Sequence, residues 1–194
     1  MQKHLFLIGP AGAGKTALLR ELLGDRLAMA GGLVTRPVRS ASGFLLGCEL
    51  APAAALAGVE GLEAQRFLFF TETGSKTDNE VYRSYGVRLL QEAVWYPYAL
   101  LDELGGFELI IPQFRAALEA LLGQELPIIG AVKTPQEAEL FRQYLGLGER
   151  FTAQAERLHL ELAQDENTLL LDVEALGQDA AREAVQRWID SFLR

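Results

Sequence analysis

The sequence contains only one cysteine, Cys48, among its 194 residues. A lone cysteine excludes an internal disulfide, so the chain must fold without such a cross-link. The first residues lead directly into an apolar run and show neither the apolar core nor the cleavage site of a signal peptide. We therefore expect a protein of the reducing cytoplasm.

Long uninterrupted apolar segments are also absent. The most apolar stretch, residues 43–62, contains Glu49, Pro52 and Glu60 together with several glycines. Charged residues and proline make such a stretch a poor membrane-spanning helix. The sequence therefore predicts no membrane segment.

Lysine is scarce, with four residues in the chain, and acidic residues outnumber basic ones by 26 to 18. The resulting net charge of −8 repels phosphate backbones, so we expect no nucleic-acid partner. No feature of the sequence predicts an oligomeric state.

The overall composition is that of a globular protein, with 49% hydrophobic and 23% charged residues. A chain of this length fits one ordinary domain with its own core. We therefore expect residues 1–194 to form a single domain.

Apolar runs alternate with helical patterns along the chain. Runs typical of strands buried on both faces occupy residues 5–8, 99–101, 128–132 and 169–171. Helices are expected at residues 15–23, 78–95 and 112–122. Two more are expected, one after a capping box that begins at Thr134 and one from Asp179 onward. Three short β-rich runs, at residues 33–35, 44–46 and 67–70, suggest an antiparallel addition. The order predicts an α/β fold with a mostly parallel central sheet and an antiparallel β add-on.

The most informative motif follows the first apolar run. Residues 9–16 match the phosphate-loop pattern G-x-x-x-x-G-K-[ST] between a predicted strand and a predicted helix. In this pattern backbone N–H groups and the helix dipole bind phosphate, the lysine reaches the β and γ phosphates, and the hydroxyl binds Mg²⁺. The predicted nucleotide-binding residues are Gly9, Pro10, Ala11, Gly12, Ala13, Gly14, Lys15 and Thr16.

Two adjacent acids, Asp102 and Glu103, end the second apolar run. Consecutive residues leaving a strand point in opposite directions, so one carboxylate can face a metal while the other faces the γ-phosphate. We expect Asp102 to bind Mg²⁺ with Thr16, and Glu103 to act as the catalytic residue together with Lys15.

Three blocks of the sequence resemble a known family. They are the phosphate loop, residues 32–39 with Gly43 and Phe44, and residues 101–109, in which D-E-hydrophobic-G-x-x-E-L is the most specific run. Together they look like the cancer-related nucleoside triphosphatase family and its prokaryotic relatives, across roughly residues 5–172.

The resemblance implies a three-layer P-loop NTPase fold and slow, Mg²⁺-dependent hydrolysis of several nucleoside triphosphates, with Glu103 activating water. Arg39 matches a basic position of the family and is a candidate phosphate contact, although Arg36 and Pro37 stand where acidic residues usually precede it. Lys133, at the end of the run 128–132, is a candidate sensor of the γ-phosphate.

Two other functions remain open at this level. Residues 35–39 also resemble the monophosphate-binding stretch of guanylate kinases, but Ser40–Gly43 lack the acidic continuation of that family. Residues 102–105 fit the D-x-x-G pattern of GTP switches, but the guanine-reading N-K-x-D is missing. A monophosphate kinase and a nucleotide-dependent switch or adaptor are therefore the alternatives to a hydrolase.

Overall fold

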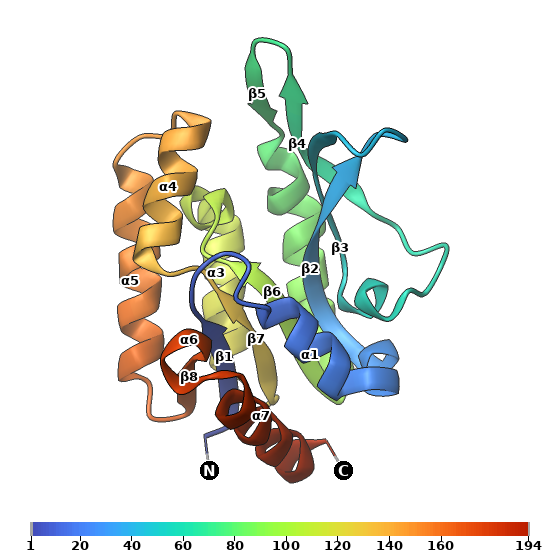
Figure 1. Ribbon diagram of the computed structural model, residues 1–194, viewed down its shortest axis with the longest axis vertical. Helices are drawn as coiled ribbons and strands as arrows, with labels where there is room; N and C mark the ends of the chain where they lie inside the picture. Colours follow the sequence, from blue (N-terminus) through green and yellow to red (C-terminus); the bar gives the residue numbers. More distant parts are fainter. Residues whose placement is uncertain (1, 194) are drawn as a thin grey trace.

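The computed structural model describes residues 2–193, and its centre is an eight-stranded sheet (Figure 1). The strand order is β5-β4-β3-β2-β6-β7-β1-β8. The strands are β1 (His4–Ile8), β2 (Ala30–Arg39), β3 (Leu45–Pro52), β4 (Gln65–Thr71), β5 (Gly74–Thr77), β6 (Tyr98–Leu104), β7 (Ile128–Val132) and β8 (Thr168–Asp172).

Parallel pairing joins the neighbours β2, β6, β7, β1 and β8. Antiparallel pairing adds β3, β4 and β5 to the free edge of β2. The predicted mostly parallel sheet with an antiparallel add-on is thus confirmed. Strand β2 belongs to both parts, because residues 30–33 pair in parallel with β6 and residues 33–39 pair antiparallel with β3.

The helices flank this sheet. The α-helices are α1 (Lys15–Leu23), α2 (Val87–Glu92), α3 (Pro112–Leu122), α4 (Pro135–Leu145), α5 (Arg150–Gln164), α6 (Val173–Leu176) and α7 (Gln178–Phe192). Shorter helical turns are η1 (Gly24–Met29), η2 (Ala53–Ala57), the π-helical η3 (Val81–Gly86), η4 (Ala93–Trp95) and η5 (Phe107–Ile110).

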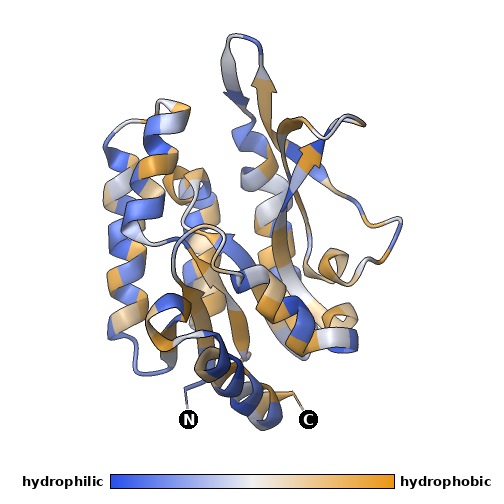
Figure 2. Ribbon diagram, viewed as in Figure 1, coloured by the Kyte–Doolittle hydropathy of each residue, from blue (hydrophilic) through white to orange (hydrophobic). Residues whose placement is uncertain are grey.

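Alternation along the strands divides the core into two layers. In β1, Phe6 packs into the cluster formed with α2, α3 and α5, whereas Leu5 and Leu7 pack into the cluster formed with α1 and α7. Figure 2 shows the apolar central strands between helices whose hydropathy varies around their surface. Burying both faces of the sheet accounts for the uninterrupted apolar runs and gives the three expected layers.

Three details differ from the prediction. Strand β5 and helix α5 were not expected, although Phe151, Ala155 and Leu158 have the helical spacing of a buried face. Strand β6 does not end before the acidic pair, because after a bulge the backbone pairs again between Leu104 and Val132.

Within residues 2–193, no helix is both long enough and apolar enough to cross a bilayer.

Candidate active site

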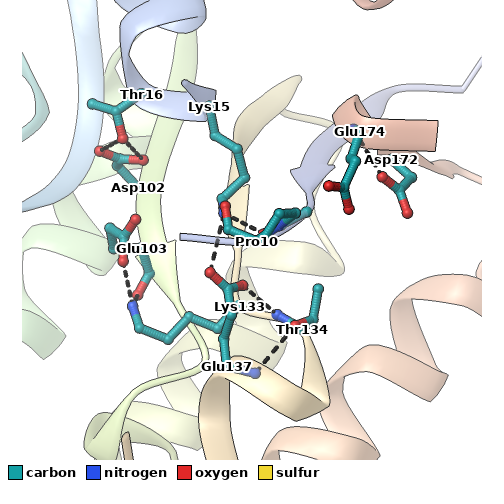
Figure 3. Close-up of polar contacts among 11 residues, drawn as sticks. Pro10, Lys15, Thr16, Asp102, Glu103, Lys133, Thr134, Glu137, Asp172 and Glu174 are labelled. Carbon is teal, nitrogen blue, oxygen red and sulfur yellow. Dashed lines mark hydrogen bonds and ion pairs between the residues drawn. The ribbon is translucent and has the colours of Figure 1, made fainter. Parts of the chain in front are cut away.

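The carboxyl ends of the parallel strands bring the predicted site residues other than Arg39 to one edge of the sheet (Figure 3). The phosphate loop follows β1, the acidic pair lies at the end of β6, and Lys133 directly follows β7. Because β6, β7 and β1 are neighbours in the sheet, segments far apart in the sequence meet here.

The loop at residues 9–14 has the curled backbone expected of a phosphate loop. Gly12 and Gly14 have φ angles of 83° and 84°, which L side chains rarely adopt, and the N–H of Ala13 donates to the carbonyl of Pro10 at 3.1 Å. Gly14 is the residue before α1, so the amides at the start of that helix face the loop. This geometry is suited to an anion.

Lys15 is only 6% exposed and points back across the loop. Its Nζ donates to the carbonyl oxygens of Gly9 at 2.5 Å and Pro10 at 3.1 Å. The same Nζ lies 3.4 Å from Oε1 of Glu137, the third residue of α4. The ammonium group is therefore held at the mouth of the loop by acceptors on two sides.

Thr16 and Asp102 form the second contact of the site. The Thr16 hydroxyl donates to the carboxylate of Asp102, with Oγ1 at 2.9 Å from Oδ2 and 3.1 Å from Oδ1. Asp102 is 2% exposed, and burial, reinforced by the negative charge of Glu103, raises its pKa from 3.8 to about 6 despite the Thr16 hydrogen bond.

This donor set fits Mg²⁺. A hydroxyl and a carboxylate side by side are the hard oxygen ligands that Mg²⁺ takes alongside substrate phosphates, and a buried carboxylate gains from a nearby cation. Among residues 2–193 no group of three or more His, Cys, Asp or Glu side chains is placed to hold a metal. Such a cluster is not required for an ion whose other ligands are phosphate and water.

Glu103 has an unusual backbone. Its φ of 66° is positive, which holds for no other non-glycine residue in the described range 2–193. Left-handed backbone at a glutamate is strained, and such strain is typical of functional sites. The turn is held from behind by Glu108, whose buried carboxylate accepts hydrogen bonds from the N–H groups of Gly105 at 2.9 Å and Gly106 at 2.8 Å.

Lys133 pairs with Glu103. Its Nζ forms an ion pair with the Glu103 carboxylate and donates to the Glu103 carbonyl oxygen at 3.2 Å. Burial by itself raises the pKa of Glu103, but the charge and hydrogen bond of Lys133, helped by Lys15, outweigh it and lower that pKa. Glu103 is therefore an ionised carboxylate at neutral pH.

A cavity of about 380 Å³ opens beside the phosphate loop. One wall is formed by residues 10–13 and the other by Val173, Glu174, Gly177 and Gln178. The Gln178 side chain donates to the Ala13 carbonyl at 2.9 Å and thereby ties the start of α7 to the loop. The cavity therefore borders residues 10–13 of the predicted phosphate loop.

Arg39 lies apart from these groups. It is exposed near the end of β2, and its side chain donates to the carbonyl of Gly43 at 3.0 Å within the same hairpin. Arg36, in the same stretch, pairs with Glu49 of β3 at 2.5 Å. The hydrogen bonds described for these two arginines therefore lie within the β2–β3 hairpin.

Two residues of the site, Glu108 and Glu137, were not predicted. Glu108 is the final glutamate of the D-E-x-G-x-x-E run. The motif therefore pointed to this residue, but the sequence did not indicate that its carboxylate holds the turn. Glu137 was expected only as the partner of Thr134 in a capping box, which the structure confirms. Its approach to Lys15 depends on the placement of α4 against the loop and has no local signal.

Comparison with known proteins agrees with this geometry. A family model described as NTPase matches residues 4–157. The chain is 30% identical over 132 residues to the nucleoside-triphosphatase THEP1 of Thermotoga petrophila, an alignment that covers 66% of this chain and 71% of that protein. It also resembles the crystal structure of THEP1 from Aquifex aeolicus with a TM-score of 0.62, covering 98% of this chain and 99% of the other. At 15% identity, this last similarity shows the fold.

Proposed function

The chain belongs to the NTPase family and is a nucleoside triphosphatase, and from this premise we propose that it hydrolyses the terminal phosphate of ATP, GTP and other nucleoside triphosphates with the help of Mg²⁺. The observation that carries the proposal is the meeting of Lys15, the Thr16–Asp102 pair and Glu103 at one edge of the sheet. Phosphate binding, metal binding and water activation are then served by neighbouring side chains.

The phosphate loop binds the β and γ phosphates through its amides and Lys15. Thr16 and Asp102 would hold Mg²⁺, which supplies positive charge to the phosphate oxygens when bound. The cavity between residues 10–13 and the segment that contains Val173, Glu174, Gly177 and Gln178 borders the loop, and we place the nucleoside there.

Glu103 is assigned to the attacking water. Its carboxylate is ionised and lies on the same edge as Lys15, so it can accept a proton from water or orient that water toward the γ-phosphate. Lys133 holds this carboxylate in place, and we assign to it a second role as a contact for the γ-phosphate. Family membership favours hydrolysis over the monophosphate kinase and the switch.

The test is phosphate release from the four common nucleoside triphosphates, with nucleotide binding measured in parallel. We expect Glu103→Gln to bind Mg·ATP like the parent chain and to lose at least about a hundredfold in turnover, because it keeps the shape of the side chain without its basicity. Lys15→Ala should weaken binding itself. Glu60→Gln, at an exposed loop position, is the matched control and should change neither.

The assignment of Glu103 fails if Glu103→Gln hydrolyses ATP at the parental rate. Including GMP as a phosphate acceptor tests the monophosphate-kinase alternative in the same experiment. Transfer of phosphate to GMP, in place of release into water, would replace the hydrolase by a kinase.

A further inference from the structure

Glu137 has two oxygens with two different partners (Figure 3). Its Oε2 accepts a hydrogen bond from the backbone N–H of Thr134 at 2.9 Å, while the Thr134 hydroxyl accepts one from the N–H of Glu137 at 3.2 Å. This capping box fixes the first turn of α4. The remaining oxygen, Oε1, faces Nζ of Lys15 at 3.4 Å.

The cap keeps this carboxylate close to the phosphate loop. Glu137 belongs to the helix, its side chain is 14% exposed, and turning Oε1 away would disturb the bond from Thr134. A negative charge is therefore fixed beside the lysine that binds phosphate. It is 122 residues away in sequence and belongs to α4.

Four charges alternate across the site, and we name them the four-charge cluster: Lys15, Glu137, Lys133 and Glu103. Ion pairs join Lys15 to Glu137 and Lys133 to Glu103, and electrostatic interactions link Glu137 to Lys133 and Lys15 to Glu103. The formal charges of the cluster cancel. A polyphosphate that approaches Lys15 thus meets a lysine already partly neutralised by a carboxylate.

We propose that Glu137 is a positioning residue that competes with phosphate for Lys15, so that it weakens the hold of the loop on the diphosphate product and returns the lysine to the loop mouth after product leaves. This inference rests on the proposed function, in which Lys15 binds phosphate. Without such a competitor, a loop that binds triphosphate tightly also retains diphosphate, because both present a β-phosphate to the same lysine and amides.

Glu137→Gln tests the charge separately from the cap. The glutamine amide oxygen still accepts the hydrogen bond from Thr134, but the charge facing Lys15 is gone. We expect about tenfold tighter binding of ADP and of inorganic tripolyphosphate at low ionic strength, measured by titration calorimetry. The difference should narrow at high salt, since it is electrostatic.

Two control variants separate this effect from others. Thr134→Ala breaks half of the capping box and keeps the carboxylate, so it should lower the unfolding midpoint without tightening ADP binding. Glu156→Gln removes one negative charge at an exposed position on α5, and should leave ADP binding unchanged. Damage to the structure weakens binding, so tighter binding by Glu137→Gln is a result that a merely structural role does not give.

Equal or weaker ADP binding by a folded Glu137→Gln variant overturns the inference. If that variant unfolds, Glu137→Asp replaces it, because the shorter side chain draws the carboxylate away from Lys15 and should also tighten binding. Failure of the parent chain to bind any triphosphate would instead refute the proposed function itself. The two failures are therefore distinguishable in one series of titrations.

Discussion

Replacing Asp102 by asparagine should stabilise the fold while it damages the site. The Asp102 carboxylate is 2% exposed, and its hydrogen-bond donor is the hydroxyl of Thr16. Asparagine has nearly the same shape and offers Thr16 an oxygen acceptor, but it carries no charge to bury. The variant thus removes the cost of desolvating a carboxylate and the capacity to bind a cation.

The magnitude follows from linkage. The pKa of Asp102 is about 6 in the folded chain, against an ordinary value of 3.8. Between these values the folded state holds more protons than the unfolded state, so stability falls as pH rises through this window and the full cost is present above pH 6. A difference of about two pH units corresponds to about 3 kcal/mol at pH 7.5, and to about 1 kcal/mol at pH 4.5.

Urea unfolding followed by circular dichroism measures this effect. In EDTA at pH 7.5, Asp102→Asn should be more stable than the parent by between about 1 and 3 kcal/mol, and the gain should shrink toward pH 4.5. Mg²⁺ with ADP should then stabilise the parent more than the variant, because binding to the folded state adds to stability.

Asp165→Asn is a control of opposite sign. Burial raises the pKa of Asp165, but hydrogen bonds from Thr168 and Asn167 outweigh it and lower that pKa, so this carboxylate stabilises the fold at neutral pH. Its replacement should destabilise the chain at pH 7.5, and the loss should diminish in acid. An Asp102→Asn variant no more stable than the parent at pH 7.5, or a gain that ignores pH, would refute the linkage reasoning.

Three further predictions concern the surrounding structure. Glu108→Ala should lower the free energy of unfolding by about 2 to 4 kcal/mol, because two buried N–H groups lose their acceptor, whereas Glu108→Gln should cost less; denaturant titration of both variants checks this. Gly130→Ala should cost at least about 3 kcal/mol by the same measurement, since its new Cβ meets the Leu101 carbonyl oxygen at 2.0 Å, and a stable variant would contradict the packing of β7 on β6. Burial, opposed in part by the Leu122 carbonyl, lowers the pKa of His4 from 6.5, so stability should decline as pH falls below 6.5. His4→Gln should reduce that decline between pH 7 and 5.5, and an unchanged pH profile would argue against a neutral, buried imidazole.

Local chemistry made the phosphate loop predictable. Three glycines with positive φ, a lysine and a hydroxyl at fixed spacing need no distant partner to form a loop at the start of α1. The bounds of α1 and α3 were likewise predicted without error, since Gly24 ends the first helix and Pro112 begins the other. The capping box at Thr134 is equally local.

The pairing between segments could not be predicted from the local sequence in the same way. Strand β5 is short and polar, with exposed residues and no apolar alternation. It forms a strand because it pairs with the edge of β4. The extension of β6 past the acidic pair also depends on a neighbour, the paired residue Val132. These features follow from pairing between strands and leave little trace in the residues themselves.

By itself the sequence determined the curled loop after the first strand, because the conformations required of Gly12 and Gly14 are properties of a few adjacent residues. The tertiary structure alone decided which side chains surround that loop. Thr16 meets Asp102 across 86 residues and Lys15 meets Glu137 across 122, contacts set by the order β6-β7-β1 and by the docking of α4. Strand order is a property of the whole core, so the charged groups around the lysine become apparent only once the sheet is assembled.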